Sequence, residues 1–230
     1  MARPKTDDPE ARAKIISAAQ ELFAVRGYDG AAIRDIARAA GVNAAMIHYY
    51  FGNKEGLYHT ILNSAAAEVR ARMIEETGGS HTAEQRLKSF VRAYATYIFG
   101  HPNLARILHR EFLSGGKHIK EIAQQQYLTN YMLMREGLRA GVRAKELRPI
   151  DLDLAPISLI GMVLIFQIAQ PLISLAIGKE KYDEQFINRL TDHTVDLFLN
   201  GAKVSARSKK ATRNSSKKRR GAGNRAKVRL

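Results

Sequence analysis

Before residue 202, the apolar residues of this chain recur at helical spacing, and no stretch alternates between apolar and polar residues as a half-buried strand does. Ile15, Ala19 and Phe23, for example, lie on one helical face, behind an aspartate (Asp7 or Asp8) that can cap a helix. Breaks rich in glycine, proline and asparagine separate this segment from further helical segments. The sequence therefore predicts an all-α fold, with short helices near the N-terminus and longer ones after them.

Cap and stop residues give the approximate bounds of these helices. Asn43 and Asn53 are typical N-cap residues, Thr82 and Gln85 form a capping-box pattern, and Gly41 is placed to end a helix in the left-handed conformation. The expected helices cover about residues 8–26, 33–40, 43–50, 54–76, 82–99, 103–112, 118–142, 151–176 and 183–200, with a kink at Pro171 and an end at Gly201.

The segment 157–177 is the most apolar part of the chain, and its 21 residues are enough to cross a bilayer. Two amides, Gln167 and Gln170, and Pro171 interrupt it, and no second such segment accompanies it. A helix that is apolar nearly all round is either embedded in a membrane or buried on every side. We expect burial in a subunit interface, because a domain of this size seldom surrounds one helix completely; a membrane span is the alternative.

The net charge of +15 is concentrated at the C-terminus. Residues 203–230 contain 12 of the 37 lysines and arginines and no acid, whereas residues 1–202 are nearly balanced. A segment of this composition cannot bury enough apolar surface to fold, so we expect a disordered basic tail. Its natural partner is a polyanion, above all nucleic acid. A solvated tail without a specific role and an anionic membrane surface are the alternatives.

The chain has no cysteine, which excludes disulfides, cysteine-ligated zinc and thiol nucleophiles and fits a reducing cytosol. Its first residues, M-A-R-P-K-T-D-D, form no apolar signal region, so a cytoplasmic protein is expected. No G-x-S-x-G, H-E-x-x-H or glycine-rich phosphate loop occurs, and no two histidines are three or four residues apart. We therefore expect no cofactor and no metal site, and an all-helical enzyme is the least favoured class.

The spacing of small and apolar residues between positions 37 and 47 is that of a helix-turn-helix. Ala37 is small where two helices must cross closely, Gly41 makes the turn, and Val42 and Ile47 fill the space beneath it. Ile47 and Phe51 are expected in the core. In such a unit the second helix enters the major groove of DNA, and here that helix reads A-A-M-I-H-Y-Y.

Residues 9–58 resemble the DNA-binding domain of the TetR family of bacterial regulators. The matching elements are, in order, A-A-Q-E-L-F, R-G-Y-D-G, I-R-D-I-A, A-G-V and Y-Y-F-G-N-K-E-G-L. The resemblance implies an all-helical homodimer whose C-terminal domain holds the dimer interface and a small-molecule pocket, and whose operator is usually released when the ligand binds. It implies a DNA-binding domain at 9–69 with its helix-turn-helix at about 32–51, a ligand-binding and dimerisation domain at 70–202, and the tail at 203–230.

The resemblance also assigns DNA contacts. Lys54 matches a common phosphate contact, and a helix N-terminus together with an ammonium attracts a phosphate. Ala44 stands where the family often has a basic or polar residue, and Ala31 and Ala32 replace its Ser or Thr, so direct base readout is expected to be sparse. The predicted DNA-binding residues are Arg34, Asn43, Ala44, Ala45, His48, Tyr49, Tyr50 and Lys54.

The implied partners are a double-stranded DNA operator, an unknown small-molecule effector and a second copy of the chain, joined through the helices at about 151–176 and 183–200. We expect a bacterial repressor that is associated with the nucleoid when bound. An architectural DNA-binding protein driven by the basic tail is the main alternative. Polar residues that interrupt apolar faces are the candidate effector contacts: Arg106, His109, Arg110, Tyr127, Tyr131, Arg135, Gln167 and Gln170.

Overall fold

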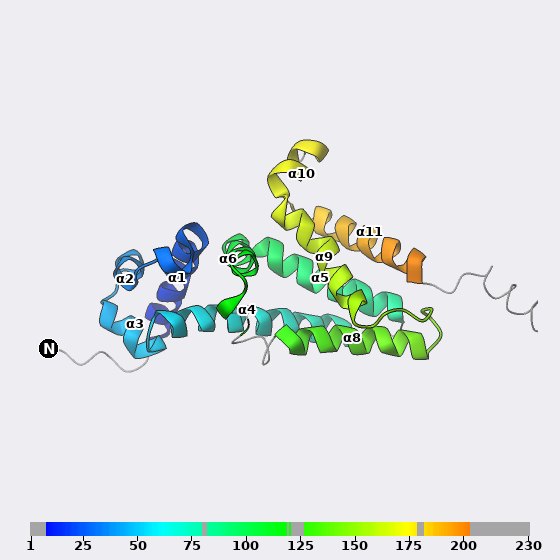
Figure 1. The fold of residues 1–230 in the computed structure, drawn as a ribbon, viewed down its shortest axis with the longest axis horizontal. Coiled ribbons are helices and arrows are strands. Elements are labelled where there is room, and N and C mark those ends of the chain that lie inside the picture. Colours follow the sequence, from blue (N-terminus) through cyan, green and yellow to red (C-terminus); the bar gives the residue numbers. More distant parts are fainter. Residues whose placement is uncertain (1–7, 80–81, 119, 121–126, 179–181, 203–230) are drawn as a thin grey trace, which may run out of the picture.

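The computed structural model describes residues 8–79, 82–118, 120, 127–178 and 182–202, and these residues contain helices and no strand (Figure 1). The all-α prediction is confirmed. The predicted basic tail lies outside the described residues. The helices are α1 (Pro9–Gly30), α2 (Ile33–Ala40), α3 (Ala44–Phe51), α4 (Lys54–Thr77), α5 (Ala83–Gly100), α6 (Pro102–Leu113), α8 (Tyr127–Arg143), α9 (Leu154–Ile168), α10 (Gln170–Ile177) and α11 (Glu184–Ala202).

The predicted caps form because short polar side chains accept hydrogen bonds from backbone N–H groups that have no partner inside the helix. The Oδ1 atom of Asp8 accepts from the N–H groups of Glu10 and Ala11, at 3.0 and 3.2 Å. Thr82 and Gln85 form both hydrogen bonds of the capping box. These local signals set where α1 and α5 begin.

The helix-turn-helix is formed by α2 and α3. Gly41 has a φ of 67°, a left-handed conformation that glycine adopts without steric cost. The N–H of Val42 donates to the carbonyl oxygen of Ala37 at 3.0 Å, which closes the end of α2. Ile47 and Phe51 of α3 are buried, as predicted, and this helix packs against α2 and α4.

A tight junction joins α3 to α4. The Oδ1 atom of Asn53 caps α4 by accepting from the N–H of Gly56 at 2.7 Å. A Cβ atom placed on Gly56 would lie 2.1 Å from the carbonyl oxygen of Phe51, which is backbone and has no room to move away. Only glycine therefore allows the start of α4 to approach the end of α3 this closely.

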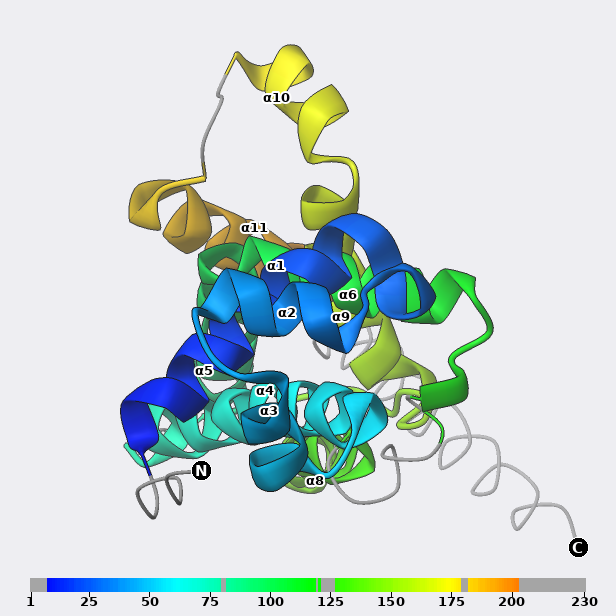
Figure 2. The ribbon, with the colours of Figure 1, turned by 90° about the vertical axis from the view of Figure 1, so that its left-hand side faces the viewer.

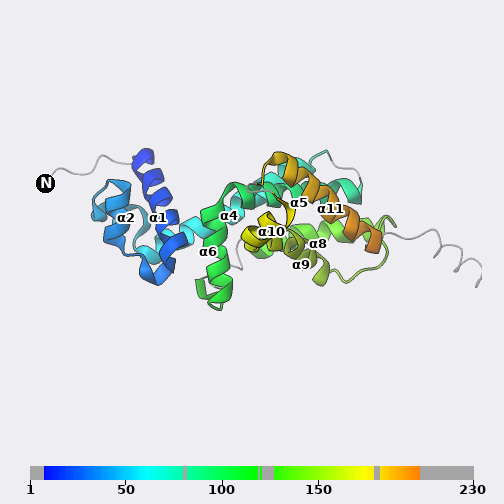
Figure 3. The same cartoon turned by 90° about the horizontal axis from the view of Figure 1, so that it is seen from above.

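Helix α4 is one continuous element of 24 residues that connects the two ends of the molecule. Figures 1 and 3 show it running from helices α1–α3 to the group of helices that includes α5 and α8. It packs against α1 and α3 near its beginning and against α5 and α8 further along. The predicted domain boundary after residue 69 falls inside this helix, and Val69 is one of its buried residues.

The predicted single helix over residues 151–176 is two helices, α9 and α10, which meet at 78°. The break lies at Ala169, two residues before the expected kink. Pro171 has no N–H group, so it cannot donate a helical hydrogen bond to the carbonyl oxygen of Gln167. It lies instead in the first turn of α10, where that hydrogen bond is not needed. Helix α10 stands away from the other helices (Figure 2) and has no buried residue.

Among the described residues no single helix meets the length and apolarity needed to cross a bilayer; the bent pair α9–α10 does so by length and composition only.

Three other expected bounds differ from the structure. Helix α1 reaches Gly30, beyond the expected end at about residue 26, and the non-helical conformation of Gly27 kinks it on the way. Helix α11 continues through Gly201 to Ala202, so Gly201 does not end it as predicted. The helix expected at 118–142 is described from Tyr127 to Arg143 as α8, and residues 119 and 121–126 lie outside the described part of the chain.

Candidate DNA-binding surface and effector cavity

The short helix α3 presents an apolar face to the core and a mixed face to solvent. Ala45, His48 and Tyr49 are exposed, and 60% of the surface of Tyr49 is accessible. Ala44 is half-buried and packs against the core. The outer face of α3 thus presents an imidazole and a phenol side by side, both of which can form hydrogen bonds.

His48 has a defined tautomer in its neutral form. Its Nδ1 atom lies 2.9 Å from the carbonyl oxygen of Gly52. A carbonyl oxygen can only accept, so Nδ1 carries the proton and donates, and Nε2 is then the acceptor of the neutral ring. An outward acceptor of this kind matches the amino groups of cytosine and adenine in the major groove.

Tyr50 is engaged within the protein. Its hydroxyl oxygen accepts from the N–H of Asp8 at 2.9 Å and its hydroxyl group donates to the carbonyl oxygen of Asp8 at 3.3 Å. These bonds join the end of α3 to the start of α1. The structure thus gives Tyr50 a role in holding α3 in place, and its predicted contact with DNA stays a prediction.

The other predicted DNA-binding residues surround α3. The Oδ1 atom of Asn43 caps α3 by accepting from the N–H of Ala45 at 2.9 Å, so a bidentate pair with adenine would compete with the cap. Lys54 donates to the carbonyl oxygen of Tyr28 at 2.9 Å, and its ammonium lies 4.3 Å from the centre of the Tyr28 ring. An ammonium has three donors, so two are left for a phosphate. Arg34 is exposed on α2.

Arg38 is a candidate phosphate contact that the sequence analysis missed. It lies one turn after Arg34 on the exposed face of α2, with 80% of its side chain accessible. It pairs with Asp35 at 3.3 Å, and Asp35 also binds Arg26 at 2.9 Å. Two arginines four residues apart on a polar helical face are a signal that the sequence contains.

A largely apolar cavity of about 480 Å³ lies between α4, α5, α6, α8 and α9. Its walls include Val69 and Met73 of α4, Leu108 of α6 and Leu164 of α9. Its volume is within the range of about 300–1,000 Å³ that is usual for small-molecule sites. The cavity is therefore large enough for an organic ligand and offers mostly apolar contacts.

The polar groups of the cavity are uncharged. Burial raises the pKa of Tyr94 to about 12 and raises the pKa values of Tyr97 and Tyr127 still further, so all three hydroxyls stay protonated at neutral pH. Asn130 donates through Nδ2 to the carbonyl oxygen of Ala66 at 2.9 Å. Its Oδ1 atom is buried and has no hydrogen-bond partner among the described residues. A buried acceptor in this position favours a ligand that brings a donor.

Of the predicted effector contacts, the structure places Tyr127 and Tyr131 in this cavity. Arg135 instead pairs with Asp153 at 2.9 Å, and Arg110 donates to the carbonyl oxygen of Val25 at 2.9 Å. The candidates that do not line this cavity are Arg106, His109, Arg110, Arg135, Gln167 and Gln170. His109 is half-buried, and burial lowers its pKa.

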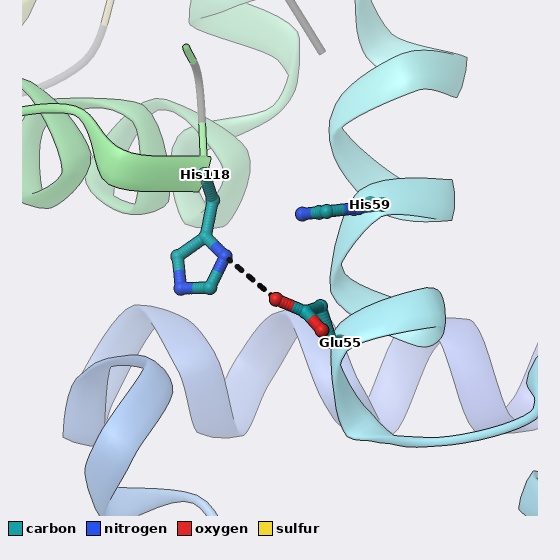
Figure 4. Close-up of side chains that lie close together, drawn as sticks. All are labelled: Glu55, His59 and His118. Atoms are coloured by element: carbon teal, nitrogen blue, oxygen red, sulfur yellow. Dashed lines mark ion pairs between the residues drawn. The ribbon is translucent and has the colours of Figure 1, made fainter. Parts of the chain in front are cut away.

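Three possible metal ligands also come together, whereas no metal site was expected from the sequence. The side chains of Glu55, His59 and His118 meet where α4 begins (Figure 4). Glu55 and His59 are four residues apart on α4, a spacing that the sequence displays, whereas the approach of His118 depends on the tertiary fold.

Comparison with known families identifies both halves of the chain. Residues 15–61 match the family of bacterial regulatory proteins, tetR family. Residues 80–207 match the tetracyclin repressor-like C-terminal domain. The second match alone covers more than half of the chain.

Individual regulators are similar to this chain over most of its length. The fatty acid metabolism regulator protein of Bacillus subtilis is 25% identical over 190 residues, which is 82% of this chain and 93% of that protein. The regulator RutR of Escherichia coli is 24% identical over 192 residues, covering 81% of this chain and 88% of its own. The crystal structure of FadR from B. subtilis in complex with stearoyl-CoA has a TM-score of 0.67 at 23% identity, covering 83% of this chain and 98% of that one.

A tetR-family regulatory protein from Rhodococcus shares the same fold, with a TM-score of 0.69 at 22% identity and coverage of 86% of this chain and all of that one. The α2–α3 unit and the cavity thus occur together in a fold that known regulators share. The chain belongs to the tetR family of bacterial regulatory proteins, and it is a DNA-binding transcriptional regulator of the ligand-responsive, repressor type.

Proposed function

We propose that two copies of this chain bind a pseudo-palindromic operator with their α3 helices in successive major grooves, and that an apolar effector in the cavity releases the DNA. The observation that carries the proposal is α3 itself. Its inner face is fixed by Ile47 and Phe51, and its outer face holds His48 and Tyr49 in the open. Half-sites about 34–36 Å apart match the two-fold symmetry of such a dimer.

We place the dimer contact on α9, α10 and α11, within the segments 151–176 and 183–200. Leu172 and Leu175 of α10 are 69% and 84% exposed, and Leu197 of α11 is 55% exposed. Exposed leucines lose their contact with water when a second copy covers them. This supports a homodimer and agrees with the interface that the apolar segment 157–177 predicts.

We further assign residues 9–69 to DNA binding and 70–202 to effector binding and dimerisation, in the bacterial cytoplasm and on the nucleoid. The matches at 15–61 and 80–207 support this division. Helix α4 belongs to both parts, since it begins beside α3 and lines the cavity with Val69 and Met73.

The effector that fits best is an elongated, mainly apolar molecule with a hydrogen-bond donor. The cavity walls are largely aliphatic and aromatic, and the buried Oδ1 atom of Asn130 accepts from no donor in the described part of the chain. FadR of B. subtilis was crystallised with stearoyl-CoA. We propose an acyl-chain ligand of this general kind for the present protein.

Selection of bound DNA from a random pool tests the function directly. The full chain, at moderate salt, should enrich one pseudo-palindrome whose half-sites are one helical turn apart. Adding the right effector should reduce the affinity for that DNA, since two ligands that prefer different states weaken each other's binding equally. Enrichment of no common sequence would contradict the proposal and favour an architectural role.

Filling the cavity should uncouple the effector from the DNA. In Leu108→Trp the indole occupies cavity space that a fatty acyl ligand would need. A missing methylene in such a pocket costs about 1–3 kcal/mol of binding free energy, and a side chain that overlaps the ligand costs more. The affinity for fatty acyl ligands should therefore fall by at least about 10-fold. Operator affinity measured without ligand should stay close to the wild-type value. The matched control is Arg106→Trp on the same helix α6, whose side chain is exposed and outside the cavity. Equal loss in both variants would mean that Arg106 contacts the effector after all.

Removing the basic tail should change the salt dependence of DNA binding. Each phosphate that a protein neutralises contributes about −0.9 to the slope of log K against log salt. Truncation after Ala202 removes 12 lysines and arginines, so the slope should become shallower and nonspecific affinity should fall, while the preferred sequence stays the same. Binding titrations at a series of salt concentrations measure both. An unchanged slope would show that the tail makes no phosphate contacts.

A further inference from the structure

We propose that Glu55, His59 and His118 form a binding site for a divalent transition metal ion of the zinc type. The three side chains come from two places in the chain: Glu55 and His59 from the first turns of α4, and His118 from the segment that follows α6 (Figure 4). None of the features that define the DNA-binding surface or the effector cavity includes them.

The geometry is close to that of a bound ion. One ligand atom from each residue lies within 4.8 Å of the other two. The Nδ1 atom of His118 is 3.9 Å from Oε1 of Glu55, and the rings of His59 and His118 are 5.6 Å apart between centroids. Ligand atoms at about 2.0–2.1 Å from a tetrahedral zinc ion lie about 3.3 Å from one another. The two ligand atoms that lie furthest apart would therefore have to approach each other by up to about 1.5 Å.

The side chains that must move have room to do so. Residues four apart on a helix lie on the same face, so Glu55 and His59 point toward a common position without a change in the backbone. The Glu55 side chain is 46% accessible and can rotate, whereas His118 is 7% accessible and offers a fixed point. The exposed carboxylate also gives an ion a path from solvent.

The donor set fits the chemistry of zinc. Two imidazoles and a carboxylate are a combination found with zinc in sites where a water molecule completes the coordination. Soft thiolate ligands are absent from this chain, and magnesium and calcium prefer all-oxygen sites, so the two nitrogens favour a transition metal.

The surroundings hold the buried histidine in place. The ring of His118 lies 4.3 Å from the ring of Tyr28 and 5.1 Å from the ring of Tyr58, measured between centroids. Tyr58 donates to Oε1 of the buried Glu111 at 3.1 Å. Ordered neighbours of this kind orient metal ligands and tune their affinity.

The position of the site has a regulatory consequence, which rests on the proposed function. Glu55 follows Lys54 in the first turn of α4, and α3 ends three residues before Lys54. An ion that ties this turn to His118 would favour one placement of α3. Metal and operator would then alter each other's affinity by the same factor.

The test measures metal binding without DNA, so its result does not depend on the proposed function. The full chain, treated with a chelator and dialysed, is titrated with Zn²⁺ by calorimetry and with Co²⁺ by visible absorption. We expect one saturable ion per subunit and a Co²⁺ spectrum typical of nitrogen ligation. Substituting a residue that only supports a metal ligand typically lowers metal affinity by about 10–100-fold. Glu55→Gln and His59→Gln remove a ligand itself, so each should weaken Zn²⁺ binding by more than about 10-fold.

His193→Gln is the matched control, because His193 is exposed on α11, and it should bind Zn²⁺ like the wild type. Zn²⁺ should also raise the Tm of the wild type and of His193→Gln, and should not raise that of Glu55→Gln, since a ligand of the native state stabilises it. His118→Gln adds a third variant, and the two half-exposed positions carry the test if its buried ring proves necessary for folding. Absence of a saturable site, binding of Mg²⁺ in preference to Zn²⁺, or equal binding in Glu55→Gln, His59→Gln and wild type would each overturn the proposal.

Discussion

Gly56→Ala is expected to destabilise the protein by about 3 kcal/mol or more, at the upper end of single substitutions, and to abolish tight operator binding. The new Cβ atom would lie 2.1 Å from the carbonyl oxygen of Phe51. Both atoms belong to the backbone or are fixed to it, so α3 and α4 must move apart, and the position of α3 is lost with them. Chemical denaturation measures the change in stability, and a titration with the selected operator measures the affinity.

Gly100→Ala is the matched control. Gly100 is the last residue of α5, and a Cβ atom there would meet no heavy atom within 4 Å. Its effect on stability should stay within about 0.5 kcal/mol, as for other substitutions on an open surface. If Gly56→Ala melted and bound DNA like Gly100→Ala, the close approach of α3 and α4 would not exist in solution.

The double substitution His48→Ala and Tyr49→Ala should weaken operator binding by about 30-fold or more, since each lost major-groove contact costs about 1–3 kcal/mol and two contacts are lost. Both side chains are exposed on the outer face of α3, so the free energy of unfolding should fall only by the roughly 0.5–1.5 kcal/mol of the hydrogen bond from His48 to Gly52. The loss should be much smaller on unrelated DNA, because contacts to base edges depend on the sequence, whereas contacts to phosphates do not. Competition between operator and random duplexes separates the two effects.

Val25→Ala serves as the control for an exposed apolar side chain away from α3. Val25 is 66% exposed on α1, and its contact with Arg110 is made by its backbone carbonyl, which the substitution keeps. We expect wild-type operator affinity. A double variant that binds the operator like Val25→Ala would remove α3 from the recognition surface.

The sequence was most informative where structure is decided by near neighbours. Asp8, Thr82 and Gln85 cap helices as predicted, because the groups that they satisfy lie two or three residues away. Gly41 ends α2 for the same reason. Pro171 changed the chain direction as expected, although the break lies at Ala169, because the carbonyls that lose their partner lie before the proline.

Prediction was weakest where several distant segments meet. Tyr131 and Arg135 are one turn apart on α8, yet only the tyrosine faces the cavity, because α9 supplies Asp153 to the arginine. Lys54 was assigned to a phosphate, and its ammonium lies on Tyr28, which is 26 residues away in the chain. His118 approaches Glu55 only through the fold. A single sequence contains the helical faces but does not say which faces meet.

Because α4 is one continuous helix, a movement of its cavity end also moves its other end, beside α3. Val69 at the cavity and Lys54 beside α3 are 15 residues apart on one rigid helix, which is about 22 Å at 1.5 Å per residue. A tilt of about 10° at the cavity end would carry the other end by about 4 Å, and opposite tilts in two subunits would change the distance between their α3 helices by about 8 Å. That displacement is roughly a quarter of the 34 Å repeat of DNA, so a small movement at the cavity is enough to put two α3 helices out of register with the grooves.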